Sequence, residues 1–451
     1  MVKNDIVRLS IESITGEGSG VGRYDGMVVF VPFSAVGDLL DVRIVKTGKS
    51  YCYGKIEQII TPSPDRVSPD CKVFGKCGGC AFRHISYEAE LRAKEDIIRS
   101  AFTRIGGLDP EFLPIIPGGS RTGYRNKAQY PVGRDKDGNI ASGFYAARSH
   151  RIVPCDKCLL EPDIFGEIRN FVLRQAALLR ISPYNEEQHS GVLRHICIRK
   201  GHYSGEICTV LVVRRNVPEL KKLAYAVMKA FPAVKGVTAN INKDITNVIF
   251  GDTDILLCGS ADINDTMLGK TFSISPRSFY QVNTPMAEKL YSEAAKLAEP
   301  DGKNIIDLYC GIGTVGITMS DNAASLTGVE VIPEAVENAI INAKTNCTEN
   351  ARFYCGDAGK ITSLLRKDGT GADVVIVDPA RKGCDTQTLD NIISFSPERV
   401  VMISCNPATA ARDCKYLSEH GYNAVNVRGV DLFPGTIHVE AVILLTRNSY
   451  E

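Results

Sequence analysis

The C-terminal part of the chain alternates short apolar runs with helical stretches, and this pattern limits the possible folds more than any other feature. From about residue 270, the runs KNIIDLYCGIGTVGITMS, SLTGVEVI, ARFYCGDA, ADVVIVDPA and RVVMISCNP are typical of buried strands. Helical stretches such as PEAVENAIINAKTN lie between them. Alternating strands and helices predict a parallel, doubly wound α/β sheet, in which ligands bind at the carboxyl ends of the strands.

A glycine-rich turn follows the first of these predicted strands. Gly311, Gly313 and Gly316 in DLYCGIGTVG have the spacing G-x-G-x-x-G, which by itself fits a dinucleotide fingerprint. Asp307 lies just before the glycines, and a carboxylate there would repel a pyrophosphate and would face a cationic or amine group. The turn therefore favours the amino-acid half of S-adenosylmethionine (SAM) over a nicotinamide dinucleotide.

Three further carboxylates stand where other predicted strands end. Glu330 ends TGVE, where it could bind a ribose; Asp357 in CGDA could bind an adenine amine; Asp378 ends VIVD. Together with Asp307 they place four carboxylates at one edge of the sheet, which favours a SAM site over a dehydrogenase. Each one taken singly also fits a helix cap, and Asp357 fits a cap best.

The segment VVMISCNPATAARD places a thiol at the end of a fifth predicted strand. Cys405 follows the predicted strand Val400–Ser404, and Asn406-Pro407 fixes the next turn. A thiolate can add to C6 of a pyrimidine, which makes C5 electron-rich enough to attack the methyl group of SAM. A base must then remove the C5 proton, and DLFPGTIHVEAVILL offers His438 and Glu440. Without a catalytic role, Cys405 would be a buried cysteine at the end of a strand, and Glu440 would be a surface residue of a strand.

The first 62 residues predict a separate small β-barrel. Residues 5–62 contain about five short alternating apolar runs between glycine-rich turns, which suits an oligonucleotide-binding (OB-like) barrel. The stretch TPSPDRVSPD (61–70) follows as a linker. Residues 121–160 hold eight Lys or Arg and three Asp or Glu, a local charge of +5. Such a patch fits RNA phosphates or, alternatively, a solvated charged face.

A group of cysteines lies between these two regions. Cys71, Cys77 and Cys80 in CKVFGKCGGC have the spacing C-x5-C-x2-C, and VPCDKCLLE supplies Cys155 and Cys158. The pattern by itself is compatible with tetrahedral zinc or with a [4Fe–4S] cluster. The first residues, MVKNDIVRLSIES, have no signal-peptide pattern, and no stretch approaches the ~18 apolar residues of a membrane span. We therefore expect a cytoplasmic protein with reduced cysteines.

Five segments together resemble one family, the RNA uracil-5-methyltransferases that use SAM. These segments are SPRSFYQVNT (275–284), DLYCGIGTVG (307–316), VDPARKGC (377–384), SCNP (404–407) and FPGTIHVE (433–440). The resemblance implies that Cys405 is the nucleophile and that Glu440 is the proton-abstracting base. It also implies that Asp378 orients the uracil and that Phe279 stacks on a flipped-out base. The residues implied to line the SAM site are Gln281, Tyr309, Glu330 and Asp378.

The resemblance extends over nearly the whole chain. The N-terminal barrel resembles a TRAM domain, an RNA-binding module of the family's ribosomal RNA branch. TGYRNKAQYPV (122–132) also matches the family and makes Arg125, Asn126 and Lys127 implied RNA contacts. The same branch implies a [4Fe–4S] cluster with a structural or RNA-folding role. Its implied ligands are Cys71, Cys77, Cys80 and Cys158, with Cys155 as the alternative fourth ligand.

We therefore expect a multidomain chain with three regions. They are a TRAM β-barrel (1–62), a central α+β domain with the iron-sulfur loop and RNA contacts (63–265), and a Rossmann-like α/β SAM-dependent methyltransferase domain (266–451). The expected function is C5 methylation of a specific uridine in 23S ribosomal RNA through a covalent cysteine–uracil C6 adduct. Transfer RNA is the alternative substrate. A non-catalytic RNA-binding iron-sulfur protein and an NAD-dependent dehydrogenase are the alternative functions. No membrane and no protein partner is predicted.

Overall fold

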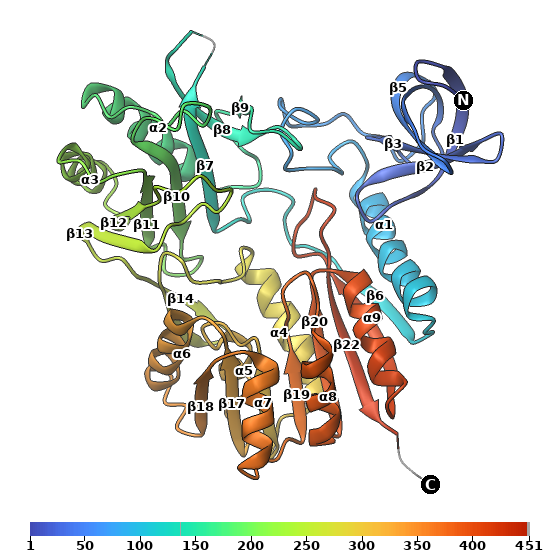
Figure 1. Cartoon of the computed structure of the whole chain (residues 1–451), viewed down its shortest axis with the longest axis vertical. Helices are drawn as coiled ribbons and strands as arrows, with labels where there is room; N and C mark the ends of the chain where they lie inside the picture. Colours follow the sequence, from blue (N-terminus) through green and yellow to red (C-terminus); the bar gives the residue numbers. More distant parts are fainter. Residues whose placement is uncertain (136, 449–451) are drawn as a thin grey trace.

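The N-terminal region forms a closed five-stranded barrel. The computed structural model describes residues 1–135 and 137–448, and Figure 1 shows the barrel at one corner of the molecule. Alternate residues of its first strand, Val7, Leu9 and Ile11, are buried in the barrel interior, as a half-buried strand requires. The predicted small barrel is confirmed. Its strands, in the order β1-β2-β3-β5-β4, are β1 (Ile6–Ile14), β2 (Ser19–Tyr24), β3 (Met27–Pro32), β5 (Tyr51–Thr61) and β4 (Leu39–Thr47).

The cysteine loop, which we define as residues 71–80, leads from the barrel into helix α1 (Tyr87–Ser100). Ser86 caps this helix, because its hydroxyl accepts a hydrogen bond from the Ala89 N–H at 3.2 Å. A π-helical turn (Ala101–Gly106) prolongs the helix, and strand β6 (Glu111–Ile116) follows. The cysteine loop therefore lies between the barrel and a long helix.

The central region is built on a seven-stranded sheet. Helices α2 (Asp163–Leu178) and α3 (Glu219–Ala230) share one apolar core with the sheet, to which Phe165, Ile168 and Leu223 contribute. In the order β13-β12-β11-β10-β7-β8-β9, the strands are Thr253–Gly259, Val234–Ile241, Ile207–Val213, Leu193–Lys200, Lys127–Arg134, Ile140–Tyr145 and Ile152–Pro154. A two-stranded ribbon, β14 (Ile263–Met267) and β15 (Lys270–Ile274), leads onward to helix α4 (Thr284–Ala298). None of the helices within 1–135 and 137–448 is long and apolar enough to cross a membrane.

An eight-stranded sheet with helices on both faces forms the C-terminal region (Figure 1). Val374 and Ile376 of β19 point into one apolar core, while Val375 and Val377 point into the other. In sheet order, the strands are β18 (Ala351–Cys355), β17 (Ser325–Glu330), β16 (Asn304–Leu308), β19 (Val374–Val377), β20 (Arg399–Ser404), β22 (Glu440–Arg447), β21 (Tyr422–Val430) and β6. Besides α4, the helices are α5 (Thr314–Thr318), α6 (Pro333–Thr345), α7 (Ala358–Lys367), α8 (Thr386–Phe395) and α9 (Pro407–Ser418). The predicted doubly wound sheet is confirmed for β16 to β20, which are parallel, whereas β22 runs antiparallel.

Strand β6 belongs to this C-terminal sheet, and helix α1 packs against the core of the sheet. Both precede the central region in the sequence. β6 pairs in parallel with β21, so that Glu111 lies opposite Asn426. Ile98, Phe102 and Ile115 are buried in the same apolar core as the β20 residues. The expected division between 63–265 and 266–451 did not include this crossing. A single edge strand about 300 residues from its partner leaves no local signal in the sequence.

Candidate active site

Cys405 and Glu440 meet at one edge of the C-terminal sheet. Strand β20 ends at Ser404, which lies opposite Ala441 of the antiparallel strand β22. The next residues beyond this last pair are Cys405 and Glu440, and Glu440 lies close enough to raise the pKa of the Cys405 thiol. Asn406 fixes the turn after the thiol, because its side chain accepts a hydrogen bond from the Ala408 N–H at 3.2 Å and so caps α9. The strand register therefore brings the two predicted catalytic residues together.

Burial raises the pKa values of Glu440, Asp378 and Cys405, which lie close together. It raises the pKa of Glu440 to about 8; nearby Asp378 raises it further, and Arg381 opposes the shift. Burial also raises the pKa of Asp378 to about 7. The pKa of the Cys405 thiol is raised to about 11 by burial and by Glu440, again against the effect of Arg381. At neutral pH the thiol is therefore protonated, and one cation, Arg381, lies beside a group that must become anionic to react.

Arg381 is the residue of this group that the sequence reasoning did not single out. Its guanidinium lies 3.3 Å from His438 Nε2. Its backbone carbonyl accepts a hydrogen bond from the Asn406 side chain at 2.9 Å. Burial and the nearby Arg381 lower the pKa of His438 to about 4, so the imidazole is neutral near pH 7. The available signal was its place in VDPARKGC, three residues after Asp378.

The glycine-rich turn between β16 and α5 has a strained backbone. Tyr309, Gly311 and Gly313 have φ values of 64°, 55° and 83°, which lie in the left-handed region. A tyrosine in this region is uncommon, and such strain clusters at ligand sites. A Cβ added at Gly311 would meet no atom within 4 Å, so open space adjoins the turn there. The turn thus offers a close backbone approach to a bound group.

Asp307 secures this turn from inside. It is buried, and its Oδ2 accepts a hydrogen bond from the Gly316 N–H at 2.9 Å. Burial raises the pKa of Asp307 to about 8, although the bond from Gly316 opposes this. The sequence reasoning placed this carboxylate opposite a cationic group of the ligand. Among the described residues its other oxygen, Oδ1, is buried without a hydrogen-bond partner, so the position opposite a cationic group stays a prediction.

The strand-end carboxylates lie on four neighbouring strands, in the order Asp357, Glu330, Asp307 and Asp378. Glu330 accepts hydrogen bonds from the N–H groups of Gly311 at 3.1 Å and of Ile332 at 2.9 Å. Asp357 caps α7 by accepting from the Lys360 N–H at 3.2 Å. Carboxylates accept up to four hydrogen bonds, so Glu330 keeps capacity for a ligand hydroxyl.

The residues expected to contact RNA differ in their exposure. Phe279 is 65% exposed, as a residue that stacks on a base must be. Asn126 is buried, and its side chain donates to the Gln281 carbonyl at 2.8 Å. Burial and the nearby Arg199 lower the pKa of Lys127 to about 8. Asn126 therefore joins the central sheet to the segment that carries Gln281, which is also buried.

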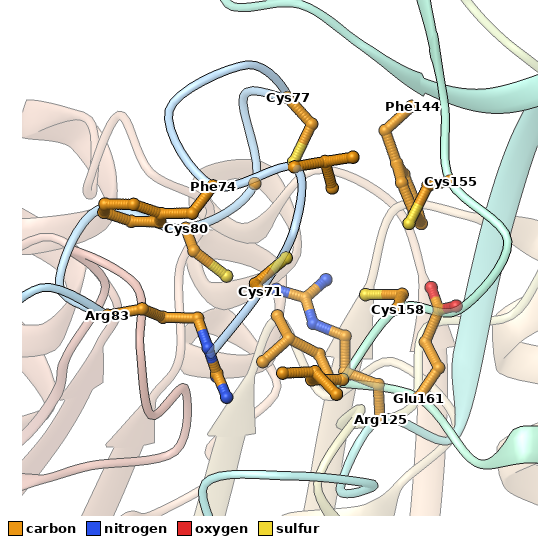
Figure 2. Close-up of a pocket in the computed structure, with 14 residues that line it drawn as sticks. Cys71, Phe74, Cys77, Cys80, Arg83, Arg125, Phe144, Cys155, Cys158 and Glu161 are labelled. Carbon is orange, nitrogen blue, oxygen red and sulfur yellow. The ribbon is translucent and has the colours of Figure 1, made fainter. Parts of the chain in front are cut away.

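Five cysteines line one cavity of about 100 Å³. Figure 2 shows Cys71, Cys77 and Cys80 of the cysteine loop on one side, and Cys155 and Cys158 on the other. Burial raises the pKa of Cys80 and of Cys155 to about 11. Across residues 1–135 and 137–448, no three His, Cys, Asp or Glu side chains are arranged to hold a metal ion.

The side chains around this cavity fit an anionic cluster in their chemistry. Thiolates are the ligands of [4Fe–4S] clusters, and five thiols exceed the four that such a cluster needs. Arg83 and Arg125 also line the cavity, where their charges would balance those of thiolates (Figure 2). The rest of the lining includes apolar side chains, such as Phe74 and Phe144.

Comparison with known proteins identifies the family. The family model described as tRNA (Uracil-5-)-methyltransferase matches residues 203–448, and the TRAM domain model matches residues 3–56. The chain belongs to the family of SAM-dependent RNA uracil-5-methyltransferases. An uncharacterized RNA methyltransferase of Halalkalibacterium halodurans is 42% identical over 446 residues, which cover 98% of this chain and 97% of that protein. One from Clostridium acetobutylicum is 41% identical over 450 residues, which cover 99% and 98%.

A solved structure shares the whole architecture of this methyltransferase. It is the Pyrococcus abyssi tRNA (uracil-54, C5)-methyltransferase in complex with S-adenosyl-L-homocysteine. The two chains are 27% identical, with a TM-score of 0.79 and coverage of 97% of this chain and 99% of that one. The expected TRAM domain and methyltransferase activity are confirmed. The dehydrogenase and the non-catalytic protein, considered as alternatives from the sequence, are thereby set aside.

Proposed function

We propose that this methyltransferase modifies C5 of one uridine in 23S ribosomal RNA through a covalent adduct with Cys405. The observation that carries the proposal is the closeness of Cys405 and Glu440, which lie next to the last pair of the β20–β22 ladder, with Asp378 and Arg381 near them. The N-terminal TRAM domain and the exposed Phe279 support an RNA substrate whose base leaves its stack.

The proposed reaction uses two side chains in sequence. The Cys405 thiol first loses its proton to solvent. The thiolate then adds to C6 of the uracil, and the electron pair of the C5–C6 double bond moves toward O4 as an enolate. When SAM is bound, C5 takes up its methyl group, and the electron pair of the broken S–CH3 bond stays on the sulfur of the leaving S-adenosylhomocysteine. Glu440 then removes the proton from C5, the enolate forms again, and its collapse restores the double bond and expels the Cys405 thiolate. Arg381 is placed to stabilise the thiolate in both steps.

The residues that would hold SAM are those of the glycine-rich turn and its neighbours. The open space beside Gly311 and the left-handed backbone from Tyr309 to Gly313 fit a closely approaching ligand. Glu330 keeps acceptor capacity for the ribose hydroxyls. The proposed set is Gln281, Tyr309, Glu330, Asp357 and Asp378, of which Asp378 also orients the uracil.

We further propose a [4Fe–4S] cluster held by Cys71, Cys77, Cys80 and Cys158, with a structural role. The reaction gains or loses no electron, so the cluster is not needed for the chemistry. Anaerobically purified protein should contain about four irons and four sulfides per chain. Cys158→Ser should lose them, and Cys155→Ser should keep them. The reverse result would make Cys155 the fourth ligand.

The function is tested by methyl transfer from labelled SAM to undermodified RNA, with ribosomal and transfer RNA assayed separately and the nucleosides identified by mass spectrometry. The expected product is 5-methyluridine in the 23S fraction, absent with Cys405→Ala. Glu440→Gln should accumulate a denaturant-resistant RNA–protein adduct. Normal turnover by Glu440→Gln without any adduct would show that Glu440 is not the base.

Transfer RNA is the second candidate substrate. The similar Pyrococcus abyssi structure is that of a tRNA (uracil-54, C5)-methyltransferase, and this observation favours it. Product in the transfer RNA fraction alone would keep the proposed chemistry and change the substrate.

A further inference from the structure

The turn that precedes Glu440 accepts hydrogen bonds from several segments of the chain. We call residues 431–436, between β21 and β22, the base turn. The carbonyls of Leu432 and Pro434 accept hydrogen bonds from the side chains of Asn283 at 2.9 Å and of Tyr124 at 3.0 Å. The Gly435 carbonyl accepts from the backbone directly after the cysteine loop, namely from the N–H groups of residues 81 and 82 at 3.0 and 3.1 Å. Segments from distant parts of the chain thus meet at this turn.

Helix α1 supplies the charged side chains that bind the base turn. Glu90 and Lys94 are both fully buried and form an ion pair of 2.8 Å. Lys94 Nζ also donates to Asp431 Oδ1 at 2.7 Å and to the Phe433 carbonyl at 3.2 Å. Glu90 Oε1 accepts from the Gly435 N–H at 2.6 Å. Two successive helical turns therefore contact both ends of the base turn.

A tyrosine and an arginine complete the cluster. The Tyr87 hydroxyl donates to Asp431 Oδ2 at 2.8 Å and accepts from the Gly118 N–H at 2.6 Å. Arg121 donates to Glu90 Oε2 at 3.2 Å. Two carboxylates face two cations, so the formal charges balance. Buried ion pairs of this kind contribute little net stability compared with apolar residues, but they fix one geometry.

We propose that Glu90 and Lys94 of helix α1 are positioning residues for proton abstraction, because they fix the base turn and hence the place of Glu440. The inference rests on the proposed function, in which Glu440 is the base. The base turn also positions His438, whose N–H donates to the Thr436 hydroxyl at 3.2 Å. Cys405 follows the end of β20, and none of the side-chain hydrogen bonds that Glu90 and Lys94 make within the described residues reaches it. Adduct formation should therefore depend less on these two residues than proton abstraction does.

The experiment separates adduct formation from adduct resolution. RNA carrying tritium at C5 of uridine releases the label when the base removes the proton, while denaturant-resistant adduct reports the action of Cys405. With Glu90→Gln and with Tyr87→Phe, tritium release should slow by about tenfold to a hundredfold. Adduct formation and SAM binding should change less than about twofold, so adduct accumulates. Glu88→Gln, an exposed carboxylate of the same helix, is the matched control and should leave both rates unchanged.

Glu440→Gln, run in parallel, separates the two proposals. If it traps no adduct, the assignment of the base is wrong. If it traps adduct, but the folded Glu90→Gln and Tyr87→Phe proteins slow both steps equally or neither, the positioning role is wrong. Thermal melts establish folding, and if Glu90→Gln does not fold, Tyr87→Phe alone decides, since it removes one hydroxyl and no charge.

Discussion

Three buried carboxyl groups, Asp307, Asp378 and Glu440, have pKa values raised to about 8, 7 and 8, mainly by burial. Each binds its proton more tightly in the folded chain than in the unfolded one, where such groups titrate near about 4. The free energy of unfolding therefore falls as pH rises from about 4 to about 8, and it levels off above that. These buried carboxyl groups therefore lower the free energy of unfolding at alkaline pH, where they are ionised.

Glu440→Gln should consequently stabilise the protein at high pH. Glutamine mimics the protonated side chain, so the melting temperature at about pH 9 should rise by a few degrees, with little change at about pH 4.5. Thermal unfolding at both pH values measures this, with Glu337→Gln on the exposed face of α6 as the control. An equal shift at both pH values would mean that titration of Glu440 is not the cause.

The methyl transfer rate should rise with pH through about 8. Glu440, with a pKa of about 8, must be ionised to take the proton, and the thiolate fraction of Cys405, with a pKa of about 11, grows tenfold per pH unit. Single-turnover rates between about pH 6.5 and pH 9 check this. A flat profile would indicate that RNA binding shifts both pKa values or that a conformational step limits the rate.

The sequence was sufficient to nominate Cys405 and Glu440, because their chemistry and motifs are local. It did not place Arg381 beside them, nor show that Asn126 is buried against Gln281. Those facts depend on strand register and on packing between domains, which no spacing within one segment encodes.

Close packing where the turn after β16 enters α5 leaves little room for a side chain at Gly316. A Cβ at Gly316 would lie 2.7 Å from Leu326 Cδ1 and 2.9 Å from Asp307 Oδ2. Leu326, Asp307 or the start of α5 must then shift. Such a shift disturbs the Gly316–Asp307 hydrogen bond that holds the preceding turn.

Gly316→Ala should therefore weaken SAM binding by at least about tenfold, which isothermal titration measures. Gly371→Ala is the control, because a Cβ added there would meet no atom within 4 Å and its φ lies outside the left-handed region, far along the chain from the turn. Equal affinities in both variants would show that the turn tolerates the added methyl group.

Among the elements, the parallel strands were predictable because each is a short apolar run followed by a helix. The antiparallel course of β22 and the edge position of β6 were not, since both are set by partners distant in sequence. The same is true of helix α1, whose buried Glu90 and Lys94 look in the sequence like part of a solvated, mixed-charge face.

At the scale of the whole molecule, a boundary at residue 266 separates β21 from β6 and α1, which pack against the same core. A fragment of residues 266–451 lacks β6 and α1, which leaves β21 as an open edge and uncovers the core where Ile98 and Phe102 pack. Exposed edges and apolar surface favour aggregation. We expect this fragment to aggregate, whereas the full-length chain should remain monodisperse and bind SAM. Size-exclusion chromatography with SAM titration checks both, and a stable, SAM-binding 266–451 fragment would contradict the prediction.

The pairing of β6 with β21 also determines when the C-terminal sheet can be completed during synthesis. Ribosomes make β6 about 300 residues before its partner strand, an interval on the order of 15–60 s at about 5–20 residues per second. During that time Lys94 and Glu90 have no base turn to hold, and the sheet edge that receives β6 does not yet exist. The barrel can fold early, but the catalytic site is assembled only after β22 has been made.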